Sequence, residues 1–205
     1  MSGQPLQEPS RASGVLAWHP RDPDEEALAA LDRRDPDAAL SVLMRAYGSA
    51  VYRYCRQMVT DADLAEEAHQ LTFVQAYEGL AGFGRRSSFK TWLFGIARHR
   101  CLDVLKMHRR RQKRFGPIDD EPDLPEPGGS VEDRLAERSL AQALERCLRT
   151  LVPRVRVAIL LRFQQGLSYP EIARLSDEKA PALQVRVARA LPFLRRCLEE
   201  KGMAP

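Results

Sequence analysis

An acidic, proline-rich stretch divides the chain and limits what it can fold into. Between Gly116 and Asp133 the sequence is GPIDDEPDLPEPGGSVED, in which proline, glycine and carboxylates leave no helical period. A segment of this composition is a linker and not a core element. On both sides of it, apolar residues recur at three- and four-residue steps, without strand-like alternation of useful length. The sequence therefore predicts an all-α protein, with two small helical domains joined by a flexible acidic linker.

In the chain of 205 residues, the composition of the N-terminus predicts a second boundary, between a tail and the first helical domain. The N-terminal stretch is rich in Pro, Ser, Gly and Gln, which is typical of a flexible tail. Helical patterning follows, stops at the linker and resumes near Val131. We therefore expect a tail (1–23), a first helical domain (24–114), an acidic linker (115–130) and a second helical domain (131–205).

The overall composition is globular and argues against several classes of protein. Hydrophobic residues make up 44%, the formal charge is +4 and the pI is about 9.0, an excess too modest to imply a nucleic-acid partner by itself. No run of about 18 apolar residues predicts a membrane span. The N-terminus lacks the pattern of a signal peptide, so we expect a cytoplasmic protein. Because phosphate-binding, dinucleotide-binding and hydrolase motifs are absent, we expect no enzyme and no metal or cofactor.

The four cysteines are widely spaced and form no metal-binding pattern. Cys55, Cys101, Cys147 and Cys197 each fall in a helix-like stretch, with no C-x-x-C pair among them. We expect buried free thiols, with a redox switch or a metal site as the alternatives.

The first domain separates acidic from basic side chains. The helix predicted over 60–80 begins with carboxylates, which suit the positive end of a helix dipole, and we expect Leu71 and Tyr77 to pack inward. The next helix, predicted from Ser87 to about Arg114, is basic and carries aromatic residues. Cations along a helix can follow phosphates and aromatic rings can stack on unpaired bases, but a solvated basic face has the same pattern. Trp92 can accordingly be a core residue or a base-facing one.

The second domain has the pattern of a helix-turn-helix. Ser168 followed by Glu171 forms a capping box at the start of a short helix, and a second short helix follows after a tight turn. Gln and Arg side chains on the open face of that helix suit base edges and phosphates. A helical hairpin in a plain bundle is the alternative. The open-face residues are Gln184, Arg186 and Arg189.

Together these stretches resemble the extracytoplasmic-function sigma factors of bacterial RNA polymerase. The segment DADLAEEAHQLTFVQAY is similar to the family pattern D-x-x-x-A-E-D-x-x-Q-x-T-F-x-x-A-[WY]. The segment SSFKTWLFGIARHRCLDVLK is similar to S-[ST]-F-x-T-W-L-x-x-I-A-x-N-x-x-x-D-x-x-R, and GLSYPEIARLS to the start of the C-terminal helix-turn-helix. The resemblance covers roughly residues 35–114 and 131–200.

The resemblance implies a distinct task for each domain, called sigma region 2 and sigma region 4. In region 2, an acidic helix should dock on core RNA polymerase, and the glycine-containing loop 82–88 with the next helix should melt the −10 promoter element and hold a flipped base. The core-binding residues are then Glu66, Glu67 and Gln70. The −10 residues are Arg85, Arg86, Lys90, Trp92, Arg98 and His99.

In region 4, the resemblance implies that the helix-turn-helix reads the −35 promoter element as a duplex. Gln184, Arg186 and Arg189 are the residues for that task. The linker should thread the polymerase's RNA-exit path, and an anti-sigma protein should hold the factor inactive. None of these tasks needs a cofactor, a metal or a catalytic residue of this chain.

Several residues depart from the family pattern. His99 stands where the family has Asn, which leaves open the identity of the base read there, and Leu71 replaces a usual Glu. Asp177 and Pro181 replace glycines of the turn; Asp can adopt the left-handed conformation at some cost. Pro192 should kink or divide the last helix.

These departures leave two functional hypotheses. The first is an alternative sigma factor that binds core polymerase and directs promoter-specific initiation under anti-sigma control. The second is a sigma-like interaction protein that binds polymerase or an anti-sigma protein but has lost efficient promoter recognition. A stand-alone helix-turn-helix repressor would leave the first domain unexplained.

Overall fold

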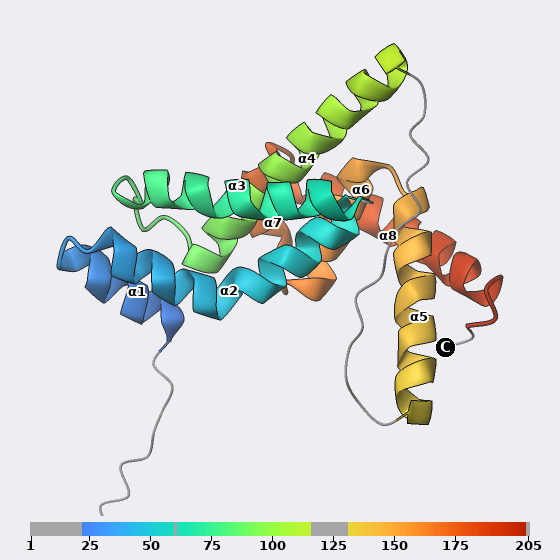
Figure 1. The fold of residues 1–205 in the computed structure, drawn as a ribbon. Helices are drawn as coiled ribbons and strands as arrows, with labels where there is room; N and C mark the ends of the chain where they lie inside the picture. Colours follow the sequence, from blue (N-terminus) through green and yellow to red (C-terminus); the bar gives the residue numbers. More distant parts are fainter. Residues whose placement is uncertain (1–21, 60, 116–130, 204–205) are drawn as a thin grey trace, which may run out of the picture.

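The computed structural model describes residues 22–59, 61–115 and 131–203. Every regular element in those ranges is helical (Figure 1), which confirms the all-α prediction for this part of the chain. The predicted linker and nearly all of the predicted tail lie outside the described residues. The helices are α1 (Pro23–Asp32), α2 (Pro36–Met58), α3 (Ala62–Leu80), α4 (Phe89–Phe115), α5 (Val131–Thr150), α6 (Pro153–Ile159), η1 (Leu160–Gln164, π-helical), α7 (Tyr169–Ser176) and α8 (Ala180–Glu199).

Helices α1 to α4 form the first bundle, and short polar caps set where its helices begin. The Asp35 carboxylate accepts a hydrogen bond from the Ala38 amide at 2.9 Å, ahead of Pro36 in the first turn of α2. Asp61 caps α3 in the same way. Helix α2 packs on α1, α3 and α4. The largest side chains buried between these helices include Leu43, Tyr54, Met58, Phe89 and Phe94.

Helices α5 to α8 form the second bundle around Leu161, Ile172 and Leu183, all fully buried. The capping box at the start of α7 is present: Ser168 accepts from the Glu171 amide, and the Ser168 amide donates to the Glu171 carboxylate at 2.8 Å. After α7, Asp177 adopts the left-handed conformation with φ of 51°. The predicted helix-turn-helix is therefore formed, with Asp in the place of the turn glycine.

One packing prediction was wrong, and one of the two outcomes predicted for Pro192, a divided helix, is not found. Leu71 and Tyr77 do not pack inward but lie on the outer face of α3, because Thr72, Phe73 and Ala76 supply its buried face. Helix α8 is not divided at Pro192 but continues to Glu199. Pro192 is itself exposed, so the hydrogen bond that it removes faces solvent, while the buried residues Ala190 and Leu194 anchor the helix on both sides of it.

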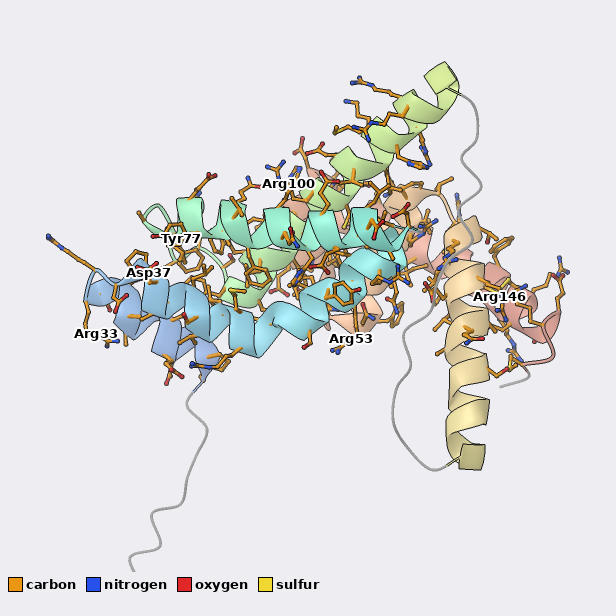
Figure 2. The ribbon with its side chains drawn as sticks, in the orientation of Figure 1. Arg33, Asp37, Arg53, Tyr77, Arg100 and Arg146 are labelled. Carbon is orange, nitrogen blue, oxygen red and sulfur yellow. A yellow bond between two sulfur atoms is a disulfide. The ribbon has the colours of Figure 1, made fainter. Side chains whose placement is uncertain are left out.

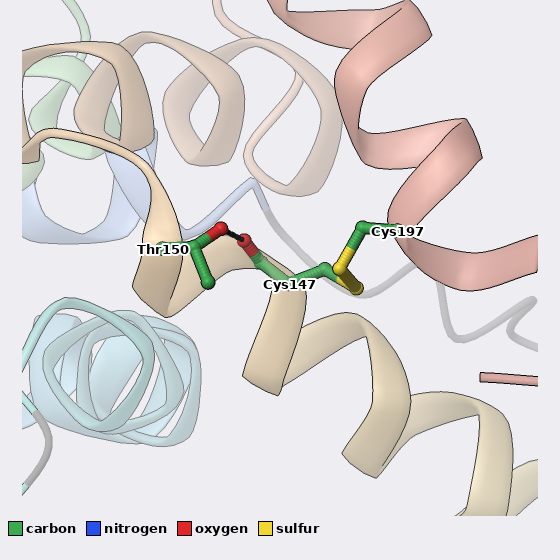
Figure 3. The surroundings of a disulfide bond; sticks show 3 residues. All are labelled: Cys147, Thr150 and Cys197. Carbon is green, nitrogen blue, oxygen red and sulfur yellow. Dashed lines mark hydrogen bonds between the residues drawn. A yellow bond between two sulfur atoms is a disulfide. The ribbon is translucent and has the colours of Figure 1, made fainter. Parts of the chain in front are cut away.

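The prediction of free thiols is right for one cysteine pair and wrong for the other. Cys55 and Cys101 are free and buried. Cys147 of α5 and Cys197 of α8 form a disulfide bond (Figure 3). The two residues are 50 positions apart in sequence, yet α5 packs on α8 and brings their Cα atoms to 5.9 Å, within the usual range for a bridge.

The two bundles pack against each other through α2, α5 and α6. Arg156 of α6 is central to this junction, with 6% of its surface exposed. Its guanidinium donates to the carbonyls of Leu148, Arg149 and Leu151 around the end of α5, and at 2.9 Å to the carbonyl of Met58, the last residue of α2. The last carbonyls of a helix have no partner within it and form its negative end. Arg156 therefore caps one helix from each bundle.

Candidate nucleic-acid interface

An aromatic cluster lies where the loop before α4 meets the start of that helix. The Phe83 and Phe89 rings stack with centroids 4.0 Å apart, and Trp92 lies 5.2 Å from Phe83. The half-buried Trp92 indole packs on Gly79 of α3, where an added Cβ would come within 3.0 Å of the ring. Trp92 therefore packs against the bundle and still borders an open cleft. This cleft, of about 290 Å³, is lined by Gln75, Glu78, Gly79, Trp92 and Ile96.

Two carboxylates of α1 hold this corner in place. Asp24 accepts hydrogen bonds from the Phe89 amide and from the Tyr47 hydroxyl, both at 2.8 Å. Burial, and then the bond to Asp24, raise the pKa of Tyr47 well above its ordinary value. Asp32 pairs with Arg85, whose backbone is left-handed. Sequence reasoning missed both carboxylates, because a cap 65 residues from its amide leaves no local pattern.

The predicted −10 residues differ in how free their side chains are. Arg86 and His99 are exposed, whereas Lys90 and Arg98 are half-buried. The Nε atom of Arg98 is enclosed by protein. Burial raises the pKa of the Tyr54 phenol, and the positive charge of Arg98 partly opposes this rise. Arg85 is engaged by Asp32. Of the six residues, Arg86 and His99 are thus the most available, and Trp92 borders the cleft.

Arg100, which also lies on α4, reaches back to α3. Its Nε donates to Gln75 at 2.8 Å, and its position between the two helices is visible in Figure 2. On the other side of α3, Tyr77 lies over Asp37 of α2 (Figure 2), and the hydrogen bond to Asp37, followed by its charge, raises the pKa of Tyr77. These two contacts hold α3 to α4 on one side and to α2 on the other.

The outer face of α3 combines acidic and apolar side chains. Glu66, Glu67 and Gln70 are exposed, and Gln70 donates to Glu66 at 3.1 Å. Leu71 and Val74 continue this face with 38% and 54% of their surfaces exposed. An exposed apolar patch beside charged residues is typical of a protein-binding surface. The structure thus brings the three predicted core-binding residues together on one face.

On α8, the three predicted −35 residues are not equally free. Gln184 and Arg189 are exposed, whereas Arg186 forms an ion pair with Glu178 of the turn at 2.6 Å. Beside them runs an apolar groove of about 800 Å³. Val152, Val185 and Phe193 are exposed in it. The open face of α8 is therefore partly cationic and partly apolar.

The two bundles also meet in direct contacts between α4 and α7. The Thr91 hydroxyl donates to the Glu171 carboxylate at 2.9 Å. One turn further along α4, Gly95 lies under Leu175, where an added Cβ would come within 2.8 Å of the leucine side chain. The glycine thus permits the close approach of the two helices.

We expect this junction to be sensitive to acid through Glu171. The hydroxyl and the amide of Ser168, with smaller contributions from Thr91 and Arg174, hold the pKa of Glu171 below its ordinary value. A lowered folded-state pKa contributes stability above the unfolded-state pKa of about 4.3, which is lost as pH falls through the folded-state pKa. The unfolding free energy should therefore fall more steeply below about pH 4 in the wild type than in Glu171→Gln.

Urea titrations at several pH values from 7 to 3 measure this difference. Glu25→Gln, at an exposed position of α1, is the control and should keep the wild-type pH dependence. An equal slope in the wild type and in Glu171→Gln would contradict the role assigned to Glu171.

Comparisons with known proteins identify two matched segments. Residues 43–115 match the family model for sigma-70 region 2, and residues 141–194 match that for sigma-70 region 4. The RNA polymerase sigma factor NccH of Alcaligenes xylosoxydans xylosoxydans is 30% identical over 180 residues, which cover 85% of this chain and 95% of NccH. The ECF RNA polymerase sigma-E factor of Escherichia coli K12 is 27% identical over 172 residues, covering 81% and 90%.

Two solved structures share the fold. The sigma factor RpoE of Bartonella quintana, solved with the anti-sigma factor NepR, aligns with a TM-score of 0.65 at 23% identity, covering 76% of this chain and 94% of RpoE. CnrH, solved with the cytosolic domain of CnrY, aligns with a TM-score of 0.62 at 24% identity, covering 87% and 99%. At these identities the likeness concerns the fold.

Proposed function

The chain belongs to the extracytoplasmic-function sigma factors of bacterial RNA polymerase, and from this membership we propose that it binds core polymerase and directs it to a specific set of promoters. The observation that carries the proposal is the presence of both sigma regions in one chain, each with a separate exposed surface. The acidic face of α3 lies in region 2, and the open face of α8 lies in region 4. RNA synthesis itself belongs to the polymerase, and the factor works where the polymerase works, in the cytoplasm.

The acidic face of α3 is the proposed core-binding surface. Exposed carboxylates provide attraction and orientation towards a basic partner, and exposed apolar side chains provide burial. Glu66, Glu67 and Gln70 supply the first, and Leu71 and Val74 the second. Leu71 replaces a usual family Glu, and at this surface it provides apolar area for burial in place of charge.

The corner of α3 and α4 is the proposed −10 surface. Melting a promoter exposes bases, and a flipped base needs a pocket with an aromatic wall to offset the loss of stacking. The cleft beside Trp92 supplies such a wall, and the exposed Arg86 and His99 can bind phosphate or base. Arg85, Lys90 and Arg98 complete the proposed set, with Arg85 positioned by Asp32.

Region 4 is proposed to read the −35 element through Gln184, Arg186 and Arg189. Because Glu178 competes for the Arg186 guanidinium, Glu178→Gln should strengthen −35-dependent initiation, whereas Arg186→Ala should weaken it by roughly 1–3 kcal/mol. The measurement compares transcription from one mapped promoter with its −35 element intact and scrambled. Arg195→Ala, at an exposed position of α8, is the control. Unchanged −35 dependence in Arg186→Ala would remove Arg186 from the base-reading set.

The packed arrangement of the two regions differs from the one that promoter binding requires. The −10 and −35 elements lie about 25 base pairs apart, or about 85 Å of B-DNA at 3.4 Å per base pair. Helices α4 and α7 are within hydrogen-bonding distance of each other through Thr91 and Glu171. We therefore propose that the regions separate when the factor binds polymerase and promoter, which breaks the Thr91–Glu171 contact and the contacts of α5 and α6 with α2.

An anti-sigma protein is the proposed regulator, since RpoE was solved in complex with the anti-sigma factor NepR, and CnrH was likewise solved with a protein partner. A specific observation keeps a second candidate function open. Arg186 is ion-paired and the α8 face is partly apolar, as expected of a sigma-like protein that binds protein partners but initiates no transcription. Transcription assays separate the two, because only a sigma factor gives reproducible start sites.

Size-exclusion chromatography with purified core polymerase tests the proposed function directly. We expect the chain to elute with the polymerase as a complex of one copy per enzyme. Separate elution at micromolar concentrations of both would contradict the proposal, since the face of α3 would then lack the partner assigned to it.

A further inference from the structure

The Cys147–Cys197 disulfide connects two helices that lie beside the predicted DNA-reading face. Cys147 is in the last turn of α5 and Cys197 is near the end of α8 (Figure 3). The same helices border the apolar groove: the end of α5 with the start of α6 forms one wall, and α8 forms the other. Cys147 lies one turn before Leu151 in the first wall, and Cys197 one turn after Phe193 in the second. The bond therefore ties the two walls together at one end of the groove.

Such a bond is unusual for a protein that works with polymerase in the cytoplasm, a premise that rests on the proposed function. Cytosolic thiols are kept reduced by glutathione and dithiol proteins, and the disulfides that do occur there are mostly transient, catalytic or redox-sensing. The other two cysteines, Cys55 and Cys101, lie equally deep in region 2 and are free. Of the two cysteine pairs, only the one in the second bundle is oxidised.

The two cysteine residues differ in burial. Cys147 is fully buried, whereas Cys197 is only partly buried. Exchange begins when an external thiolate attacks an accessible disulfide sulfur. Cys197 Sγ is therefore the point of attack, and Cys147 is the leaving thiolate.

We propose that Cys147 and Cys197 form a thiol–disulfide exchange site, whose partner is a cytosolic dithiol reductant and whose oxidation state sets the rigidity of α8. A reductant thiolate attacks Cys197 Sγ, the bridge breaks, and Cys147 leaves and takes up a proton. The second reductant thiol then attacks the mixed disulfide, and Cys197 leaves and is protonated. Two electrons pass to the protein, and the reductant becomes a disulfide. Glutathione disulfide reverses the reaction.

The consequence for α8 follows from its packing. Leu183, Val187 and Ala190 anchor the helix up to Ala190, whereas beyond it only Leu194 among the residues of α8 is buried, and Leu191 and Phe193 are exposed. Reduction removes the covalent tie of this C-terminal part to α5. We expect residues 191–199 to open locally more often, because local opening free energies are lowest where few buried contacts hold a segment. The groove and the end of the reading helix then become less rigid together.

The test uses the full-length wild-type protein with dithiothreitol and glutathione buffers as probes. Alkylation of the folded protein followed by peptide mass spectrometry should show Cys197 becoming reactive after reduction, ahead of the buried Cys147, with Cys55 and Cys101 reactive only after unfolding. Hydrogen exchange of residues 191–199 should be at least about tenfold faster in the reduced protein. A bridge that resists excess dithiothreitol in the folded protein, or equal exchange in the two states, would overturn the proposal.

Variants separate the bridge from side effects of the reductant. Cys197→Ser should show the fast exchange of residues 191–199 with and without dithiothreitol, while Cys55→Ala should keep the wild-type response. Reductant-sensitive exchange in Cys197→Ser would also overturn the proposal. Because these readouts need neither polymerase nor promoter, a failure of polymerase binding counts against the proposed function and leaves the exchange site to be judged separately.

Discussion

Replacing Arg156 by methionine should lower the free energy of unfolding by about 3–5 kcal/mol. Methionine fills a similar volume, but the carbonyls of Leu148, Arg149, Leu151 and Met58 lose the donors that Arg156 supplies. The bonds to Leu148 and Met58 are the buried ones, and a buried acceptor without its donor costs about 1–3 kcal/mol. The lost positive charge also removes a favourable interaction with the negative ends of α2 and α5.

Urea denaturation followed by circular dichroism measures this loss. Arg154→Met is the matched control, because Arg154 lies on the same short helix but is exposed; its effect should stay within about 0.5 kcal/mol. Arg156→Lys should fall between the wild type and methionine, since one ammonium cannot reach all the carbonyls that the guanidinium reaches. Equal stability of Arg156→Met and Arg154→Met would contradict the capping role.

Reversing two charges on α3, by Glu66→Lys with Glu67→Lys, should weaken core-polymerase binding by roughly 100-fold. Both side chains are exposed, so the change should leave the fold intact. Two repulsive pairs would replace two attractive ones at the proposed core-binding surface, and like charges across an interface cost several kcal/mol. Titration of labelled protein against core polymerase measures the change in affinity.

A double variant of equal charge change provides the control. Glu25→Lys with Glu200→Lys alters two exposed carboxylates outside α3, and it should bind polymerase with nearly wild-type affinity. Higher salt should reduce the difference between the two double variants, because screening weakens interactions between exposed charges. Similar losses in both would show that net charge, and not the face of α3, controls binding.

Local features of the fold were predictable from the sequence because their causes are local. Asp35 with Pro36, and Ser168 with Glu171, are caps within a few residues of the amides they serve, so spacing alone identifies them. Asp177 in the turn is another such case, since few residue types tolerate a left-handed backbone.

Contacts between distant elements were not predictable in this way. Asp24 caps α4 across 65 residues, and Arg156 reaches Met58 across 98. The Cys147–Cys197 bridge depends on how α5 crosses α8. None of these pairs has a periodic or motif-like signature, because packing of whole helices creates them.

The candidate sites were likewise predictable in their local features and not in their long-range contacts. The residue types and their helices could be predicted, including Glu66, Glu67 and Gln70 on one face. The state of each side chain could not, as Arg85 and Arg186 illustrate: each is held by a carboxylate from another segment. The roles of all these residues in polymerase and promoter binding stay predictions until variants are measured.

Mapping of transcription start sites with purified core polymerase and this chain tests the central claim most directly. A library of genomic fragments serves as template, and core polymerase alone is the control. We predict reproducible starts that depend on the added chain and share one sequence element near −10 and another near −35. A normal complex with polymerase that yields no chain-dependent starts would contradict the assignment as an initiation factor and favour the interaction protein.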